Sequence, residues 1–593
     1  MKMRISTSGF KTSIIFLTAA VLFFTPALSG PAEVSDATFA VKVEENVMIP
    51  MRDGTRLAAD IYKPVGEGPF PIILQRTPYD KLSRSQVELA HDYASRGYVV
   101  ALQDTRGRFA SEGEFRNYLD DGWGKLQDGY DTVEWLAEQP WSNGKVGTFG
   151  SSYPGTIQYL MAVTRPPHLT AMFVSNAAAD FYQEVRYHGG GFMGHGVRWQ
   201  VGNQAFTRNV DTVEDWGMLL EASPPEKALS LESLISPTFL EWVNNPTDGP
   251  FWKQMSVNQK FEEVEVPIFH HGGWFDRFRR GITQSFIGVS GKGRTDTGRK
   301  AQKLIMGPWP HSAQGVQTVA GVDFGPEAAV DIDVLRLRWF DYWLKGIENG
   351  IMDEPPVQIF VMGDNQWRNE EEWPPARAVP TPYYFRAGAP GSPSYSLNDG
   401  GLSKARAGID ERPDSFRYDP KDPLPTLGGD TRFGEQGPVD QREVEKESLT
   451  YTSDPLSEEV EVTGHPEVTL HVSSNAVDTD FVVILADVAP DGSSRLLGRN
   501  LLRAKYHKTF EKAELLEPGQ VYELKIEMSP TSHVFKTGHR IRLSVSSSSY
   551  PHWIPNPNTG LDFKDGGTVR VAINTVHHDN RRSSHITLPV IPR

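Results

Sequence analysis

Short apolar runs alternate with amphipathic segments in the first third of the chain, and this alternation most constrains the fold. The stretches 70–77, 98–104 and 145–150 each carry a short apolar run, a pattern typical of strands buried on both faces. Helical patterns over 85–96 and 128–139 separate these runs. Because strands that alternate with helices form a parallel sheet covered on both faces, the sequence predicts an α/β domain.

The alternation lapses after residue 180 and resumes near residue 266. The intervening segment is rich in Trp, Phe and polar residues at helical spacing, which predicts a helical insertion. From about residue 378, short alternating runs are separated by loops rich in Pro, Gly and Asp, which predicts an all-β sandwich or jelly roll. The expected organisation is an α/β domain over 37–179 and 266–377, a helical cap over 180–265, and a β domain over 378–593.

Residues 1–29 have the layout of a signal peptide. Three basic residues precede an apolar stretch from Ile14 to Phe24, and small residues such as Ala27 and Gly30 follow. The apolar stretch is short for a membrane span of ~20 residues, although an uncleaved anchor is the alternative. We therefore expect an exported protein, periplasmic or secreted, that is free of the membrane once the signal is removed.

Composition excludes several classes of function. The formal net charge is −15 and no basic stripe is evident, which argues against a nucleic-acid partner. The chain has no cysteine, so disulfides, thiolate catalysis and cysteine-based zinc sites are excluded. The glycines at 189–191 follow no strand and precede no Lys-Ser/Thr pair, so they predict a turn and not a phosphate-binding loop. We expect neither a metal nor a cofactor.

Two polar features near the sheet are interpreted as structural. The stretch QDTRGRF carries Asp104 and Arg106 directly after an apolar run, and these residues are expected to tie a loop to the sheet edge. Asp128 is expected to cap the helix that begins there.

The segment GSSYPG, which begins at Gly150, places two serines between an apolar run and a helical pattern. This arrangement is typical of a nucleophile elbow, which exposes a serine on a strained strand-to-helix turn. If Ser151 were the nucleophile, the preceding small residue would be replaced by Phe149. With Ser152 that position is Gly150, and Tyr153 supplies the backbone N–H for an oxyanion. The alternative is a Ser-Ser turn without chemistry.

Partners for Ser152 follow in the order serine, acid, histidine that α/β hydrolases use. Asp276 comes shortly after one apolar run, and His311 follows the next. Asp276 would fix the imidazole tautomer, and His311 would accept the serine proton. His270 and His271 compete for the second role, but they lie inside a strand run, where buried structural histidines are expected.

Five separated motifs resemble one enzyme family: DTRGRFASEGEF, GSSYPG, GGWFD, GPWPH and the late SHVFKTGHRIRLSVSSS. The chain is similar to the bacterial cocaine esterase and α-amino acid ester hydrolase group, in the serine-peptidase family S15 named after X-Pro dipeptidyl-peptidase. The resemblance spans nearly the whole chain after the N-terminal segment. It implies an α/β-hydrolase domain, an inserted helical cap and a C-terminal jelly roll of the galactose-binding type.

The resemblance also implies site residues. Tyr79 stands where the family places a tyrosine hydroxyl as the second oxyanion donor. Members that act on α-amino acyl groups carry acidic residues two and three positions after the triad acid, whereas this chain has Phe278 and Arg279 there, after Arg277. A further acidic position in the early cap corresponds to Arg186. The pocket candidates are Arg277, Arg279, Arg186 and Trp274.

Arginines in place of carboxylates would repel a substrate ammonium group, unless they form only a solvated or salt-bridged face. The sequence therefore predicts a serine hydrolase for small esters or amides with a neutral, aromatic or anionic acyl group. The alternatives are X-Pro dipeptidyl-peptidase activity on short peptides, α-amino acid ester hydrolase or β-lactam acylase activity, and a non-catalytic carbohydrate-binding protein. The oligomeric state is left open, a homo-oligomer included.

Overall fold

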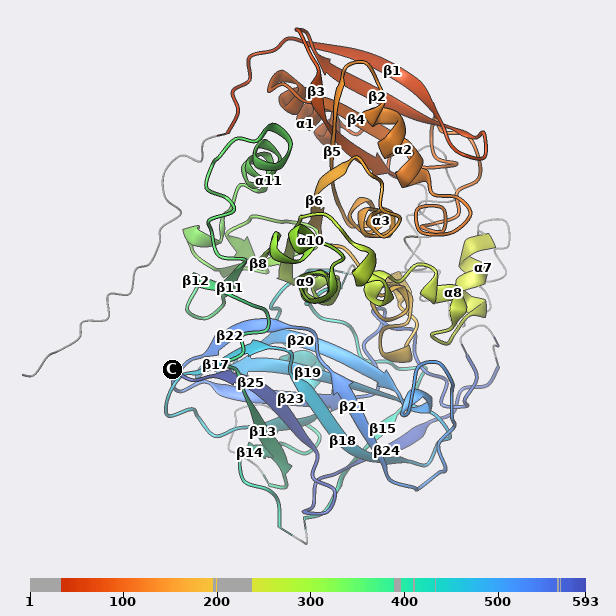
Figure 1. The fold of residues 1–593 in the computed structure, drawn as a ribbon. Coiled ribbons are helices and arrows are strands. Elements are labelled where there is room, and N and C mark those ends of the chain that lie inside the picture. Colours follow the sequence, from red (N-terminus) through yellow and green to blue (C-terminus); the bar gives the residue numbers. More distant parts are fainter. Residues whose placement is uncertain are drawn as a thin grey trace, which may run out of the picture.

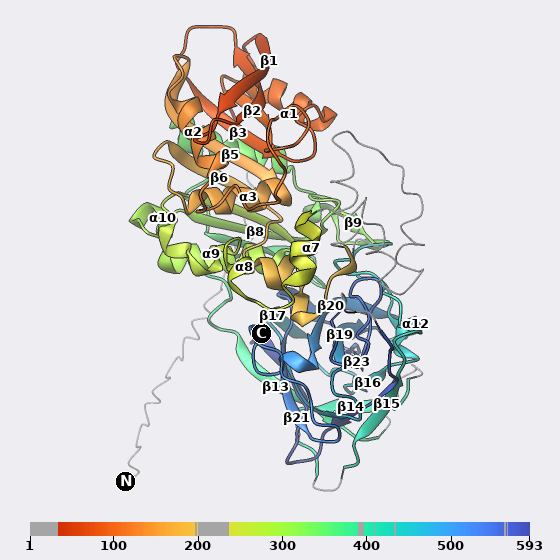
Figure 2. The same ribbon diagram turned by 90° about the vertical axis from the view of Figure 1, so that its right-hand side faces the viewer.

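A computed structural model describes most of the chain, and its two main bodies are stacked end to end (Figures 1 and 2). The described residues are 34–195, 199, 237–388, 396–408, 411–431, 434–562, 565 and 567–593. The expected signal peptide over 1–29 lies outside them. Within these ranges, no helix has both the length and the apolar character needed to cross a membrane.

The first body is built on a ten-stranded sheet in the order β1-β2-β4-β3-β5-β6-β7-β8-β11-β12. The pairs from β4 through β11 are parallel, while β1, β2 and β12 pair antiparallel at the two edges. The strands are β1 (Val41–Pro50), β2 (Arg56–Pro64), β3 (Phe70–Thr77), β4 (Val99–Asp104), β5 (Ser142–Ser151), β6 (Leu169–Ser175), β7 (Ile268–Phe275), β8 (Gln302–Pro310), β11 (Val357–Val361) and β12 (Gln366–Glu370). A small hairpin, β9 (Thr318–Val319) with β10 (Val322–Asp323), lies apart.

Helices cover both faces of this sheet, so alternate residues of a strand enter different cores. On one face α1 (Arg84–Ser95) and α11 (Ile332–Phe340) pack over Ile73. On the other, α2 (Asp128–Ala137), α3 (Tyr153–Ala162) and α9 (Arg279–Lys292) pack over Ile72 and Leu74. A short α10 (Asp296–Lys300) follows α9. The predicted α/β domain with a parallel sheet is confirmed.

The helical segment after β8 changes its type of helix part-way along. The α-helix α11 ends at Phe340, and the chain continues as a π-helical turn over Asp341–Lys345. This turn ends at Gly346, which has a φ of 74°, a left-handed conformation that glycine adopts without strain.

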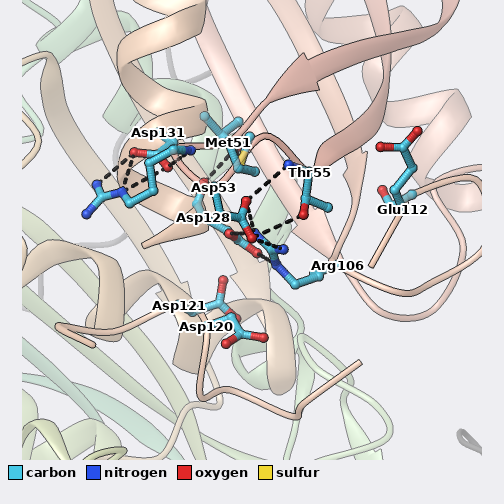
Figure 3. Close-up of polar contacts among 12 residues, drawn as sticks. Met51, Asp53, Thr55, Arg106, Glu112, Asp120, Asp121, Asp128 and Asp131 are labelled. Carbon is cyan, nitrogen blue, oxygen red and sulfur yellow. Dashed lines mark hydrogen bonds and ion pairs between the residues drawn. The ribbon is translucent and has the colours of Figure 1, made fainter. Parts of the chain in front are cut away.

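Asp128 does not cap α2, contrary to the sequence-based expectation. It is the first helical residue, and its carboxylate accepts hydrogen bonds from Nε and Nη2 of Arg106 at 2.9 and 2.7 Å. Arg106 also donates to Asp53 in the turn between β1 and β2, as Figure 3 shows. A buried ion pair with two hydrogen bonds satisfies both charges better than a cap would. The prediction that Arg106 ties its loop to the edge of the sheet is confirmed.

The segment between β6 and β7 leaves the sheet and returns to it, since these two strands are parallel neighbours. Its described parts are helical or irregular and include a π-helical turn over Tyr182–Arg186, α7 (Pro237–Asn244) and α8 (Pro250–Lys253). Residues 196–198 and 200–236 of the expected helical cap lie outside the described ranges. A Cβ added at Gly189 would lie 1.7 Å from the Leu501 carbonyl oxygen, so the glycine turn is a close contact with the second body.

The start of this segment buries a carboxyl group, Glu184, whose Oε2 accepts a hydrogen bond from Ala179 N–H at 3.0 Å. Burial, and then the neighbouring Asp180, raise the pKa of Glu184 to about 8. In the unfolded chain a glutamate ionises near pH 4.3. The folded state therefore binds more protons between about pH 4.3 and pH 8, and stability falls as the pH rises through this window.

We expect Glu184→Gln to remove this pH dependence, since an amide keeps the acceptor oxygen and does not ionise. The difference in thermal midpoint between the variant and the wild type should grow in favour of the variant from pH 5 to pH 8. Glu88→Gln, at a solvent-exposed position of α1, is the matched control and should show no such trend. An equal difference at both pH values would contradict the assignment of a proton to Glu184.

The second body is an all-β domain, as the sequence predicts. Thirteen connected strands surround a separate hydrophobic core, and all but one of their pairings are antiparallel, β14 with β16 being parallel. A short helix, α12 (Arg442–Glu445), lies within it. The strands are β13 (Val379–Arg386), β14 (Gly400–Ser403), β15 (Asp414–Tyr418), β16 (Leu449–Thr452), β17 (Val460–Gly464), β18 (Glu467–Ser474), β19 (Asp480–Val488), β20 (Ser494–Arg503), β21 (Tyr522–Glu527), β22 (Thr531–Phe535), β23 (Arg540–Ser546), β24 (Ala572–His577) and β25 (His585–Ile591).

Candidate active site

Ser152 lies at the turn between β5 and α3 in a strained backbone conformation. Its φ of 66° and ψ of −120° are rarely adopted by residues other than glycine. Two nearby glycines, two positions before and three positions after Ser152, leave room for this turn. A Cβ added at Gly150 would lie 2.5 Å from Cβ of Pro154, and one at Gly155 would lie 2.5 Å from the Ser175 carbonyl oxygen. Both glycines of GSSYPG therefore allow α3 to pack closely on the sheet.

Three side chains from separate strand ends form a chain of hydrogen bonds. His311 follows β8, and its Nε2 lies 3.1 Å from Oγ of Ser152. Its Nδ1 lies 2.6 Å from Oδ2 of Asp276, which follows β7. Since the carboxyl ends of parallel strands meet at one edge of the sheet, residues far apart in sequence come together there.

Neighbouring groups fix the acid and the imidazole in place. Asp276 is fully buried, and its Oδ1 accepts a hydrogen bond from Phe278 N–H at 2.6 Å. The Phe278 ring packs edge-on against the imidazole of His311, with ring centroids 5.6 Å apart. Phe278 therefore packs against the histidine of the candidate site. In sequence, it is notable only for standing where some members of the family that the chain resembles carry an acidic residue.

Tyr79 lies beside this chain of hydrogen bonds and makes contact with two aromatic residues. Its ring meets that of Tyr153 edge-on, and its hydroxyl accepts a hydrogen bond from Nε1 of Trp199 at 3.1 Å. Tyr153 is the first residue of α3, so its backbone N–H has no partner within the helix and is available to an oxyanion. Its own hydroxyl accepts from Tyr118 N–H at 2.9 Å. Nothing in the sequence indicated Trp199, because it lies 120 positions from Tyr79.

The two competing histidines are buried on β7 and form hydrogen bonds with residues outside the Ser152–His311–Asp276 series. His270 bonds to the Tyr159 hydroxyl and to Gln302, at 2.7 and 2.8 Å. His271 lies 2.9 Å from Oγ of Ser175. Burial lowers the pKa of His270 to about 4 and that of His271 to about 3, so both are neutral at pH 7. The expectation of structural histidines here is confirmed.

Two of the pocket candidates belong to the protein interior instead. Trp274 is fully buried, donates from Nε1 to the Phe360 carbonyl at 2.7 Å and packs against Trp373. Its assignment to a substrate pocket is wrong, because it lies on a strand whose neighbours enclose it. Arg279 is also buried and donates to the Trp274 carbonyl, while the charge of Asp430 in the second body acts on it. Its place is the contact between the two bodies.

The other two pocket candidates are arginines with nearly buried side chains. Arg186 and Arg277 are 2% and 9% exposed. The guanidinium of Arg277 lies 4.7 Å from the ring centroid of Phe278, next to His311. Burial raises the pKa of the Tyr118 hydroxyl, and the positive charges of Arg186 and Arg277 both act to lower it, so the two arginines lie in one electrostatic environment. In the part of the chain that the structure describes, no group of three or more His, Asp or Glu side chains could hold a metal ion.

A parallel sheet in this strand order, with a serine on a strained turn after β5, defines an α/β hydrolase. The sequence model of X-Pro dipeptidyl-peptidase (S15 family) matches residues 53–313, and that of the X-Pro dipeptidyl-peptidase C-terminal non-catalytic domain matches residues 349–587. The chain is 36% identical to cocaine esterase from Rhodococcus sp. (strain MB1 Bresler), over 93% of this chain and 99% of that protein. It therefore belongs to the S15 family and is a serine hydrolase.

Solved structures show the same fold across nearly the whole chain. An aminopeptidase from a marine sediment Thaumarchaeota archaeon superimposes with a TM-score of 0.81 at 25% identity, covering 97% of this chain and 100% of that one. An α-amino acid ester hydrolase superimposes with a TM-score of 0.80 at 24% identity, covering 96% of this chain and 100% of that one. The resemblance predicted from the five sequence motifs is confirmed.

Proposed function

We propose that the chain is an exported hydrolase that cleaves carboxylic ester or amide bonds through an acyl-enzyme formed on Ser152. The observation that carries this proposal is the hydrogen-bonded series Ser152–His311–Asp276 at a strained strand-to-helix turn. The similarity to cocaine esterase supports an ester as the bond attacked. The expected signal peptide supports export.

The reaction would run in two halves. Oγ of Ser152 attacks the substrate carbonyl carbon as Nε2 of His311 takes the serine proton, and Asp276 stabilises the imidazolium. His311 then passes this proton to the leaving alcohol or amine as its bond to the carbonyl breaks. In the second half, His311 takes a proton from water, which attacks the acyl-enzyme, and Ser152 regains a proton as the acid departs. The partner is thus a small ester or amide.

The finer organisation forms part of the same proposal. Residues 180–265 would act as a helical cap over Ser152, because they connect β6 to β7 beside the end of β5 where the serine lies. Residues 378–593 would form a jelly roll, which the thirteen-stranded arrangement around one core supports. The α/β-hydrolase domain would then comprise 37–179 and 266–377.

Labelling with a fluorophosphonate tests the nucleophile directly. The purified protein should become labelled, and peptide mapping should find the probe on Ser152. A panel of p-nitrophenyl acyl esters, glutaryl amides and Gly-Pro-p-nitroanilide then tests the reaction class. We expect ester cleavage to dominate. Fast release from Gly-Pro-p-nitroanilide would instead support X-Pro dipeptidyl-peptidase activity, and absence of labelling would contradict the proposal.

Tyr79 and the N–H of Tyr153 would stabilise the oxyanion of the tetrahedral intermediate. We expect Tyr79→Phe to lower kcat by roughly 10²–10³-fold with little change in KM, because a donor to the oxyanion acts mainly in the transition state. Steady-state kinetics on a p-nitrophenyl ester measure this effect. Tyr130→Phe on α2 is the control and should retain wild-type rates. A rise in KM alone for Tyr79→Phe would assign Tyr79 to substrate binding instead.

A further inference from the structure

Arg186 is a buried cation with two aromatic rings beside it. It ends the π-helical turn that begins at Tyr182, and such turns are frequent at functional sites. Its guanidinium carbon lies 3.5 Å from the ring centroid of Trp242 and 5.6 Å from that of Trp199. Both indole rings lie within cation–π distance of the guanidinium and stabilise its charge. An indole ring has no nitrogen or oxygen acceptor, so these contacts do not satisfy the guanidinium N–H groups.

One edge of this guanidinium is unsatisfied. Nη1 donates to the Val185 carbonyl at 2.9 Å. Nε and Nη2, which share the other edge, are buried and have no hydrogen-bond partner within the described parts of the chain. Burying charged donors without acceptors is unfavourable, so a ligand that supplied acceptors here would gain free energy.

The same edge binds carboxylates elsewhere in this chain. Nε and Nη2 of Arg503 each donate to Asp480 at 2.9 Å, and Nε and Nη2 of Arg106 donate to Asp128 at 2.9 and 2.7 Å. These buried pairs show the two-oxygen, two-nitrogen geometry that a guanidinium favours. The free edge of Arg186 has the donors for one more such pair.

Arg186 lies close to the proposed oxyanion donor. Trp199 packs against its guanidinium and donates to the Tyr79 hydroxyl at 3.1 Å, so a single side chain links the two residues. Burial, together with the smaller effect of the positive charge of Arg277, lowers the pKa of Arg186 to about 9. Arg186 is thus cationic at pH 7, and two arginine charges act on the region beside Tyr79.

We infer that Arg186 binds a carboxylate carried by the acyl group of the substrate, so that the enzyme selects half-esters or half-amides of dicarboxylic acids. This inference rests on the proposed function, because it names the substrate class of the same site. A neutral acyl group would leave the edge of Arg186 unsatisfied. An α-ammonium group would meet like charge from Arg186 and Arg277.

The test compares three esters on the full-length enzyme. They are p-nitrophenyl hydrogen adipate, p-nitrophenyl heptanoate as the neutral chain, and p-carboxyphenyl heptanoate, which carries the carboxylate on the leaving group. We expect kcat/KM for the adipate ester to exceed that for heptanoate at least tenfold after correction for spontaneous hydrolysis. Arg186→Met should lower kcat/KM for the adipate ester by about 30-fold or more and leave the heptanoate within about threefold.

Controls separate recognition from folding. Arg186→Lys keeps the charge but lacks the paired N–H groups, so its loss on the adipate ester should be intermediate. Arg84→Met, at a side chain 91% exposed, should match the wild type. Free adipate should inhibit wild-type hydrolysis of p-nitrophenyl heptanoate competitively, a measurement that needs no variant.

The outcomes distinguish this inference from the proposed function. Efficient hydrolysis of heptanoate without preference for adipate, or without inhibition by adipate, overturns the inference and leaves the serine hydrolase intact. A preference for p-carboxyphenyl heptanoate would mean that the site recognises a carboxylate on the leaving group, which also overturns the inference. An equal loss of activity on the adipate and heptanoate esters in Arg186→Met overturns the inference as well. If no ester is cleaved, the proposed function fails, and calorimetric binding of adipate still decides whether Arg186 holds a carboxylate.

Discussion

Replacing Ser152 by alanine is expected to lower kcat for ester hydrolysis by roughly 10⁴–10⁶-fold, the range found when the nucleophile of a serine hydrolase is removed. Without Oγ no acyl-enzyme forms, and His311 has no hydroxyl proton to accept. Steady-state rates with enough enzyme to detect slow turnover, together with fluorophosphonate labelling, measure the loss. The thermal midpoint should not fall, since the side chain removed is small and only partly buried.

Ser151→Ala is the matched control, because it removes the same atom one residue earlier. Ser151 is solvent-exposed, and its Oγ accepts only a long hydrogen bond of 3.3 Å from Asn176 Nδ2 among the described contacts. Its activity should stay within about threefold of the wild type, as is usual for a surface substitution that removes no buried contact. A severe loss in Ser151→Ala with activity retained in Ser152→Ala would reverse the assignment.

Asp276→Asn is expected to lower kcat by about 10⁴-fold, the loss known for the same change in a Ser-His-Asp triad. Asparagine can still accept the hydrogen bond from Phe278 N–H through its oxygen. Its NH₂ group would then face Nδ1 of His311 and favour the tautomer that carries the proton on Nε2. That tautomer cannot accept the proton of Ser152, so the chemical step fails while the geometry stays intact.

Two measurements check this explanation. The KM of Asp276→Asn should change little, because the acid does not contact the substrate. Rates should recover partly at high pH, where hydroxide ionises the serine without help from the histidine. Asp296→Asn, on the exposed helix α10, is the control and should behave as the wild type. A loss confined to KM would mean that Asp276 orients substrate and not His311.

The sequence predicted most of the first sheet because each of its strands is marked locally. Buried parallel strands are continuously apolar, and the helices between them carry one apolar stripe, so both signals lie within short windows. Ser152, Asp276 and His311 could be found for the same reason, since each follows the end of a recognisable strand. The order of strands in the second body depends on contacts such as β14 with β16, which no local pattern records.

The environment of the site was less predictable than its reactive atoms. Asp128 resembled a helix cap in sequence, but its carboxylate forms an ion pair with Arg106, which follows the end of another strand. Trp274 lies two residues from Asp276, yet its side chain is enclosed in the core and donates to the Phe360 carbonyl of β11. These outcomes depend on partners distant in sequence. Spacing along one segment therefore cannot decide whether a residue faces substrate or protein.

The segment between β6 and β7 leaves the sheet and rejoins it at neighbouring positions. Asn176 N–H donates to the His271 carbonyl at 2.8 Å as the chain departs, and Met172 N–H donates to the Pro267 carbonyl at 3.1 Å where it returns. The entropy of closing such a loop grows only slowly, by about 0.6 kcal/mol for each doubling of its length. Insertions, deletions and substitutions in this segment therefore change the stability of the sheet only a little. Changes in the residues around Arg186 can therefore alter the surroundings of the site without moving the strand ends that carry Ser152, Asp276 and His311.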